Sequence, residues 1–308
     1  MISVIPIVIN NFIFKRVKAP KIAHRKWHCI ELILCHLRCA ICRQLSRSLN
    51  VKLFITIGIS LWASVNEPLS IFYFSGYRND RIHWHLNNPS VTYSTLYKDV
   101  QFWENGLSFQ IVQRDIAFCV RGSYAAFGRG DLVETVPIST CTDTHGWAAD
   151  ASGYIGYAVN LTADRLYSVI LTPLLGYSGH FEQLNQQRLV WNGFLFGAQF
   201  TIEPLGNLAF NVGYAYNILS NRMHSVLSGD LYRSVKSCSS GNMGQSAWAQ
   251  MDWKTSAVWR IGLGGRLNYF STRVVDADVH RASYLNEKQF LKLRETSVSG
   301  WLQFMRIF

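Results

Sequence analysis

Few side chains in this sequence of 308 residues have the spacing that catalysis or metal binding requires. Cys39 and Cys42 have C-x-x-C spacing, but a zinc site needs a second such pair or a His pair, and only scattered histidines are near. His83 and His85 lie on one face of an extended segment without an evident third ligand. Gly262-Leu263-Gly264-Gly265 lies within a predicted strand, where glycine makes room for neighbouring side chains. We therefore expect no catalytic residue, no metal and no cofactor.

The composition favours a fold that hides apolar surface without spanning helices. Charged residues make up 16% of the chain and aromatic residues 14%, which is poor in charge for a soluble protein. No stretch reaches the ~20 consecutive apolar residues of a membrane-spanning helix. A closed sheet in lipid satisfies its backbone groups between strands and fits these numbers. A soluble all-β fold fits them as well.

The net charge of +11 is concentrated in residues 1–50. They contain nine Lys or Arg and one Glu, which leaves a charge of +3 for the rest of the chain. A nucleic-acid surface would have to lie there, and we expect none. We interpret 1–50 as a basic, Cys-containing extension that either results from an over-extended start or is a genuine part of the protein.

Residues 51–63 have the layout of a secretory signal. Lys52 precedes the apolar run Leu53 to Trp62, and the small residues Ala63 and Ser64 follow. The run is too short for a stable spanning helix, so export and removal of this segment is the better interpretation. We expect cleavage after Ala63, and a barrel over 64–308.

Alternation of apolar residues with small or polar ones is the main structural signal. In 207–220, the apolar face carries Leu208, Phe210, Val212, Tyr214 and Tyr216. Segments 257–273 and 151–162 alternate in the same way, as strands of a barrel in lipid do. The last strand places Leu302, Phe304 and Phe308 on one face. Such a terminal aromatic residue predicts delivery to the barrel assembly machinery.

We therefore predict an all-β fold, a transmembrane antiparallel up-and-down β-barrel of about ten strands. Short links such as 203–207 are expected as periplasmic turns, and the longer links 129–150, 221–245 and 274–295 as outside loops. The strands are predicted near 70–85, 92–111, 115–128, 151–162, 166–183, 187–202, 207–220, 246–254, 257–273 and 296–308.

Polar side chains on the inner faces are candidates for a pore lining. A narrow passage with arginines would favour anions, whereas ten strands enclose little more than their own side chains, so a polar plug with small conductance is the alternative. In the predicted outside loops, Cys141 and Cys238 are candidates for a disulfide in an oxidising envelope. The predicted lining residues are Arg121, Arg260, Arg266, Asn211, Asn217 and Asn268.

Strand order and spacing over 69–308 resemble the omptin-like ten-stranded barrels, and more closely the Protochlamydia outer membrane protein family of chlamydia-like bacteria. The segments that carry the likeness are 74–84, 94–100, 174–178, 188–193 and 263–269. The resemblance implies a bacterial outer-membrane location, outer-membrane lipid as surroundings, and a porin-like role.

Omptins are surface proteases, so we compare the residues of their catalytic site with the corresponding positions of this sequence. The resemblance places an Asp-x-Asp pair after the third strand and an Asp-x-His pair after the seventh. Here the first position offers Asp131 and Glu134, with Asp143-Thr144-His145 nearby, and the second offers His224 with Arg222 where the aspartate belongs. An arginine there supplies no acceptor to orient the imidazole. We therefore expect no protease activity.

The expected function is that of a non-enzymatic outer-membrane protein with a porin-like or surface-structural role. Small solutes or a host surface ligand are the partners that this role implies. An omptin-like protease with a degenerate site, and an adhesin that acts through the loops at 129–150 and 221–245, are the alternatives.

Overall fold

The computed structural model describes residues 69–87, 92–113, 115–136, 138–162, 167–204, 207–226, 232–272, 275–281 and 286–308. The predictions for 1–50 and for the signal-like segment 51–63 lie outside these residues. Within the described part of the chain, no helix is long and apolar enough to cross a bilayer.

The regular structure of the described residues consists of strands. Their bounds are β1 (Leu69–Asn87), β2 (Thr92–Gln113), β3 (Ile116–Val136), β4 (Ile138–Tyr157), β5 (Val159–Asn160), β6 (Tyr167–Leu184), β7 (Gln187–Pro204), β8 (Leu208–Val226), β9 (Tyr232–Lys254), β10 (Trp259–Ser271), β11 (Val275–Arg281) and β12 (Asn286–Ile307).

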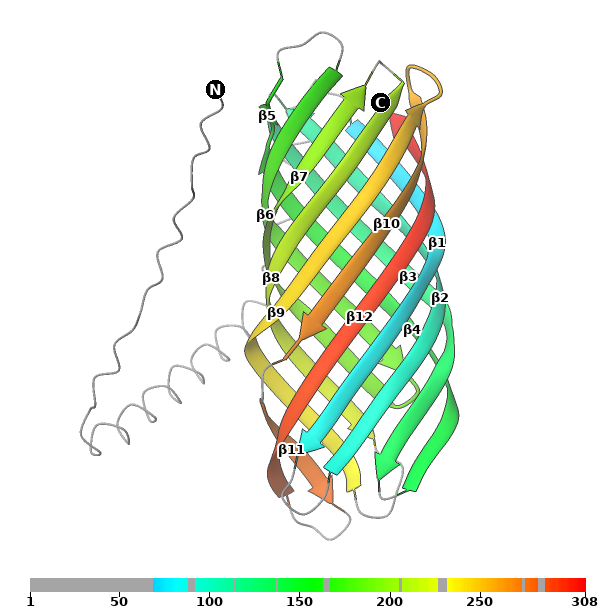
Figure 1. The fold of residues 1–308 in the computed structure, drawn as a ribbon, viewed down its shortest axis with the longest axis vertical. Coiled ribbons are helices and arrows are strands. Elements are labelled where there is room, and N and C mark those ends of the chain that lie inside the picture. The colour runs from blue at the N-terminus through cyan, green and yellow to red at the C-terminus, as the bar shows by residue number, and fades with distance from the viewer. Residues whose placement is uncertain are drawn as a thin grey trace, which may run out of the picture. The chain divides into compact units, whose positions relative to one another are not determined.

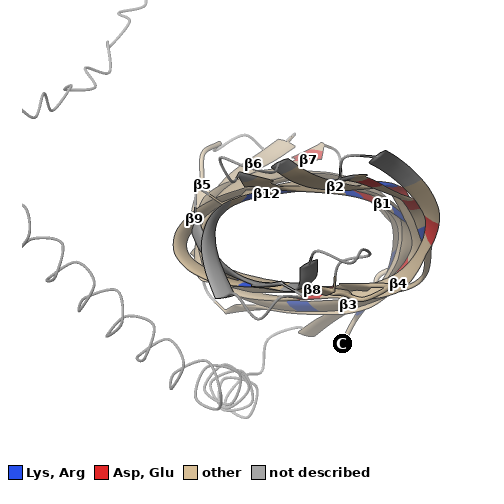
Figure 2. Cartoon of the chain, turned by 90° about the horizontal axis from the view of Figure 1, so that it is seen from below, with Lys and Arg blue, Asp and Glu red and all other residues tan. Residues whose placement is uncertain are grey.

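Each strand pairs antiparallel with its neighbours, and the sheet closes on itself through β1 and β12 (Figure 1). The short strand β5 pairs with β6 beyond the end of β4, and β11 lies between β9 and β12 beyond the end of β10. The wall is therefore a ten-stranded barrel, as the sequence predicts, and Figure 2 shows it as an oval ring. Closure matters because it leaves no strand edge with unpaired backbone groups.

Both ends of the wall meet at one end of the barrel, where the Phe308 backbone N–H donates to the carbonyl of Leu69. We call the half of the barrel next to these residues the terminal half, and the other the distal half. The terminal half carries a belt of exposed apolar side chains. On β10 the belt extends from Trp259 to Tyr269, which at a rise of about 3.3 Å per residue and a tilt of about 45° spans roughly 25 Å, the height of a lipid-facing barrel band.

The predicted faces are confirmed in this belt. Val212 and Tyr214 on β8, and Leu302 and Phe304 on β12, are 46–54% exposed, while the residues between them face the lumen. The glycines of β10 make room inside, as predicted. A Cβ atom on Gly264 would lie 2.5 Å from the indole ring of Trp301.

In the distal half the two faces exchange their chemistry. On β1, Tyr73 and Tyr77 are exposed in the belt, but Arg81 and His83 occupy the same outer face further along. The inner face there is apolar and fully buried, and it joins the inner faces of neighbouring strands in one core. This distal core contains Ile82, Trp84, Leu86, Tyr93, Tyr97, Val100, Phe102, Ala125, Ala148, Leu184, Leu189, Trp191, Leu219, Met223, Val235, Phe270, Leu291 and Leu293.

β-Bulges lie at the boundary between the two halves, which we call the seam. The pairing of β2 with β3 shifts register after Lys98, and Asp99 has a φ of 52° there. Before this bulge Tyr97 is buried, and after it Val100 is, so the inward positions change from odd to even numbers. A bulge inserts one residue and so transfers the following side chains to the opposite face.

The prediction of three long loops is wrong. Residues 129–150 belong mostly to β3 and β4, and residues 221–245 mostly to β8 and β9. Most of 274–295 lies in β11 and β12. The sequences of these segments lack the apolar alternation of a lipid-facing strand, because the strands extend the wall beyond the belt.

The exchange of faces predicts opposite responses to an added charge. Val212→Arg places a guanidinium at the middle of the belt, and should lower the free energy of unfolding in phospholipid vesicles by about 2–4 kcal/mol. Thr135→Arg, on the exposed outer face of the distal half, should change it by less than about 0.5 kcal/mol. Urea titration followed by tryptophan fluorescence measures both. Equal losses would contradict the assignment of the belt.

Candidate functional site

The lumen of the terminal half contains a polar cavity of about 410 Å³. Five of the six residues predicted to line a pore border it, and Asn268 borders a smaller void of about 20 Å³ next to it. The five are Arg121, Arg260, Arg266, Asn211 and Asn217. Their inward orientation follows from the strand alternation, whereas solute passage past them stays a prediction.

Most charges in this cavity have partners. The guanidinium of Arg121 lies 3.9 Å from the ring centre of Phe74 and 4.3 Å from that of Trp301, which are cation–π distances. The carboxylate of Asp252 accepts hydrogen bonds from the side-chain amides of Gln250 and Asn211, at 2.7 and 3.2 Å, and a third from the side-chain amide of Gln303 on β12. A buried carboxylate with three amide donors is well satisfied.

A cluster of charged side chains lies deeper in the lumen, at the seam. Arg78 and Asp80, two residues apart on the inner face of β1, form an ion pair in which Nη2 lies 2.6 Å from Oδ2. The Nε–H of Arg78 also donates to Asp80 at 2.8 Å, and its Nη1 contacts Asp150 on β4. Arg78 and Asp80 are 2% and 0% exposed. Water therefore contributes little to screening these charges.

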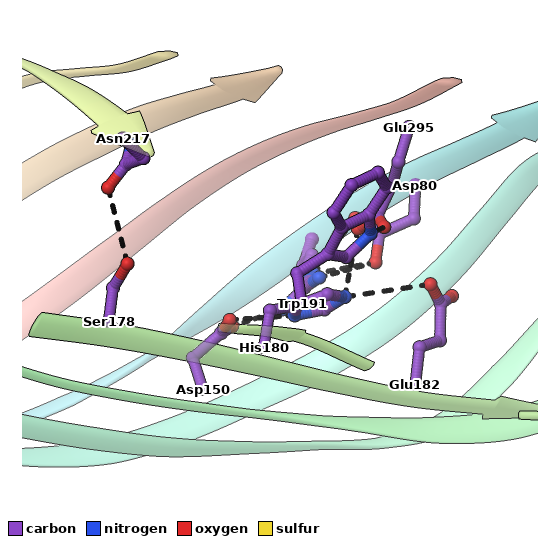
Figure 3. A network of polar contacts seen from close by, with 9 residues as sticks. Asp80, Asp150, Ser178, His180, Glu182, Trp191, Asn217 and Glu295 are labelled. Atoms are coloured by element: carbon purple, nitrogen blue, oxygen red, sulfur yellow. Dashed lines mark hydrogen bonds and ion pairs between the residues drawn. The ribbon is translucent and has the colours of Figure 1, made fainter. Parts of the chain in front are cut away.

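His180 on β6 is the centre of the cluster (Figure 3). Its Nδ1 lies 2.7 Å from Oδ1 of Asp150. Its Nε2 lies 2.8 Å from Oε1 of Glu295 on β12 and 3.7 Å from Oε2 of Glu182. Trp191 on β7 donates its indole N–H to the other oxygen of Glu295 at 2.6 Å. One imidazole thus faces three carboxylates.

Burial and charge make this seam cluster unlike the rest of the lumen. It comprises Arg78, Asp80, Asp150, His180, Glu182 and Glu295, and thus four carboxylates against one guanidinium and one imidazole. Glu182 and Glu295 are 1% and 0% exposed. Removing charges from water costs several kcal/mol per ion unless partners compensate it. The excess of carboxylates leaves part of that cost uncompensated.

The cluster offers ligand atoms. One atom from each of His180, Glu182 and Glu295 lies within 4.8 Å of the other two. These groups are buried between the distal core and the large cavity of the terminal half.

Sequence reasoning missed the seam cluster. The signals that could have found it are two pairs of ionisable residues at a spacing of two, Arg78-x-Asp80 and His180-x-Glu182, which put both members of a pair on one face of a strand. Each pair lies on a face that is otherwise apolar or small, where an ionisable residue demands a partner.

The residues tested for an omptin-like site lie on the outer wall of the distal half. Asp131 on β3 is exposed and opposite Asp143 on β4, and His145 is exposed on the same strand. Glu134 faces inward and accepts a hydrogen bond from Tyr93 at 2.7 Å. These groups do not converge across a barrel mouth.

The second half of that constellation lies elsewhere on the wall. Arg222 and His224 are on β8, and β6 and β7 separate this strand from β4 in the sheet. Arg222 is exposed and His224 half-buried, and both alternate with inward-facing neighbours.

The disulfide candidates are also far apart in the sheet. Cys141 lies on β4 and Cys238 on β9, with β6, β7 and β8 between them, and both are exposed. Their predicted place in loops is wrong, and the structure gives no support to a bond between them. Cys119 is buried, and its Sγ lies 3.4 Å from the hydroxyl of Ser108.

His83 and His85 lie on the outer face of the distal half of β1. The Nε2 of His83 is 2.9 Å from the hydroxyl of Ser94. The cationic residues Arg294 and Lys292 are their partners in register on β12. Burial and these neighbouring positive charges lower the pKa of His83, an environment that does not favour a cation.

Comparison with known proteins supports the fold. No family model and no curated protein matches the sequence. The outer membrane protease OmpT of Escherichia coli is similar with a TM-score of 0.61 at 8% identity, over 78% of this chain and 97% of that chain. The translocator domain of the autotransporter NalP from Neisseria meningitidis has a TM-score of 0.35 at 12% identity, over 89% and 98%. The likeness to OmpT, at 8% identity, shows a shared barrel fold only.

The seam cluster predicts a large effect from the loss of its one guanidinium. Arg78→Met leaves Asp80 and Asp150 buried without their cation, and should lower the free energy of unfolding by about 3–5 kcal/mol. Adding Asp80→Asn should restore part of the loss, because it removes one of the orphaned charges. Urea titration of the refolded barrel measures both.

The matched control is the exposed pair of Lys98 and Asp99, whose side chains are 49% and 56% exposed. Lys98→Met should cost less than about 1 kcal/mol. A loss for Arg78→Met as small as that for Lys98→Met would show that the cluster is well hydrated.

Proposed function

We propose that this chain is a bacterial outer-membrane β-barrel without catalytic activity, with a surface-structural role rather than that of an open porin. The belt of the terminal half supports the location, because it matches the height of the hydrocarbon layer and has aromatic residues along it. The likeness in fold to OmpT, an outer-membrane protease, supports it as well. Heat-modifiable migration of material in the outer-membrane fraction tests it.

The finer parts of the proposal rest on the sequence. The signal-like segment 51–63 would direct export, and the resemblance to the Protochlamydia outer membrane protein family would place the protein in a chlamydia-like bacterium. The assembly machinery would recognise β12, which is followed by Phe308, an aromatic residue 59% exposed beside the belt.

The distal core is the observation that carries the surface-structural role. Its side chains fill the lumen beyond the seam, and large ones such as Trp84, Trp191 and Leu293 are at most 1% exposed. Trp84 is fixed by a hydrogen bond to Gln187 at 2.9 Å and by its ring contact with Tyr93 at 5.1 Å. Water and ions do not cross a close-packed apolar layer of this kind.

The two alternatives have less support. An omptin-like protease needs carboxylates and a His that face one another. Asp131 and Asp143 are neighbours on β3 and β4, but β6 and β7 separate them from His224 on β8. Cleavage of peptides by the refolded barrel that disappears in His224→Ala would favour the protease. An adhesin would act through the polar outer wall of the distal half, since the predicted loops 129–150 and 221–245 are mostly strand.

The core predicts that conductance depends on its packing. The wild-type barrel should show no channel steps in planar bilayers, and Trp84→Ala should produce small ones because it opens the distal lumen beside the seam. The matched control is Trp103→Ala, which removes an indole 54% exposed on the outer belt and should leave the bilayer silent.

Both tryptophan variants need a check that the barrel has folded, because truncation of a buried tryptophan costs about 3–5 kcal/mol. Heat-modifiable gel migration provides it. Steady conductance by the wild-type protein would overturn the closed-lumen proposal and restore the porin-like one.

A further inference from the structure

The two ring nitrogens of His180 have different surroundings. Nδ1 is hydrogen-bonded to Asp150, and Nε2 faces the carboxylates of Glu182 and Glu295. Asp150 accepts from Nδ1, at 2.7 Å, which places the proton of a neutral imidazole on that nitrogen. Nε2 then carries a lone pair. Metal-binding histidines are oriented in this way, with a carboxylate holding the nitrogen that does not bind the metal.

The atoms that face Nε2 lack ordinary partners. Neither carboxylate oxygen of Glu182 accepts a hydrogen bond from a described residue, although the side chain is 1% exposed. Nε2 of His180 and Oε1 of Glu295 lie 2.8 Å apart and yet are not aligned as a hydrogen bond. Buried oxygens without donors are uncommon, and each calls for a cation or a proton.

We infer that His180, Glu182 and Glu295 bind one divalent transition-metal ion inside the barrel, with Asp150 as the residue that positions the imidazole. The three ligand atoms come from β6 and β12, which lie on opposite sides of the barrel, and they are within 4.8 Å of one another. A metal with ligand distances of about 2.0–2.2 Å holds its ligand atoms roughly 3 Å or more apart, so a small contraction of Glu182 toward Nε2 completes the set.

Charge balance supports a doubly charged ion. The seam cluster contains four carboxylates, whereas its fixed cation is Arg78, and Arg266 borders the adjoining void next to Asp150. With a neutral imidazole, these groups sum to a charge of −2, which one divalent ion neutralises. A protonated His180 would neutralise half of it.

The ligand types indicate the class of metal. One imidazole nitrogen and two carboxylates suit Zn²⁺ or Mn²⁺ better than Ca²⁺ or Mg²⁺, which prefer oxygen ligands alone. The void of about 20 Å³ beside Asp150 and His180 has room for a water molecule next to the site. Arg266 lines both this void and the large cavity, so a cation approaching the folded barrel meets a positive charge.

The metal ion is added during refolding, because Arg266 would repel a cation that approaches the site in the folded barrel. The full chain is refolded in detergent with Zn²⁺, freed of loose ions by gel filtration, and assayed for bound zinc. The wild-type protein should retain one zinc ion per chain more than Glu182→Gln, which keeps the shape of the side chain and removes the charge. This difference cancels any zinc held by the cysteines of residues 1–50.

The matched control is Asp252→Asn, a substitution of a lumen carboxylate that is 2% exposed but has amide donors. It should retain as much zinc as the wild type. Cobalt loading adds a spectroscopic check, since visible d–d absorption should be lost in Glu182→Gln and kept in Asp252→Asn. Heat-modifiable migration confirms that each variant is folded, and Glu295→Gln repeats the test should Glu182→Gln fail to fold.

Three outcomes would overturn the inference. Equal zinc content in the wild type and in folded Glu182→Gln would show that the carboxylate is no ligand. Equal losses in Glu182→Gln and Asp252→Asn would show a general effect of lumen charge. Zinc-free wild-type protein, with unchanged stability in the presence of Zn²⁺, would show that protonation of His180 alone balances the cluster.

Discussion

The outer face of this wall is apolar over the terminal half and polar over the distal half, so a strand that runs through both must exchange its apolar face. β1 makes the exchange within a few residues, where outward Tyr77 gives way to outward Arg81 and inward Arg78 gives way to inward Ile82. The hydrophobic effect drives both halves, but it removes apolar surface from water in different ways. The proposed outer-membrane location would bury the outward surface of the terminal half in lipid, whereas the distal half packs its apolar surface inside.

The alternation on β1 keeps its phase through this exchange, whereas β2 and β3 bulge at the seam. The extra residues around Asp99 on β2 and Phe127 on β3 move the alternation by one position while the strands stay paired on either side. Both have positive φ, an unfavourable conformation for most side chains. Phe127 is 82% exposed, so its place is set by the wall rather than by packing of its own ring.

The sequence predicted the belt well and the distal half poorly, for the same reason. Alternation such as that of 207–220 fixes a strand when the outer face is uniformly apolar, so the barrel, its even strand number and its inward polar residues could all be predicted. In 129–150 the outer face is polar and the bulge near Phe127 breaks the period of two, so the strand pattern of that segment resembles a loop. This segment is nevertheless part of the wall because its backbone pairs with the neighbouring strands, and such pairing cannot be seen in the sequence.

The sequence displays the pairs of ionisable residues on β1 and β6 but not their meeting, because the members of the seam cluster come from β1, β4, β6 and β12 and meet only in the closed barrel. The composition of the cluster also argues that its role is not to stabilise the fold. Replacing a buried ion network by packed apolar side chains is often neutral or stabilising, and the distal core directly beyond shows that this lumen accommodates large apolar residues such as Trp84 and Leu293. A charged layer with more carboxylates than cations therefore imposes a desolvation cost that an apolar layer would avoid. The cost is smaller when an ion neutralises the excess, and the donor-free oxygens of Glu182 mark where that ion would lie.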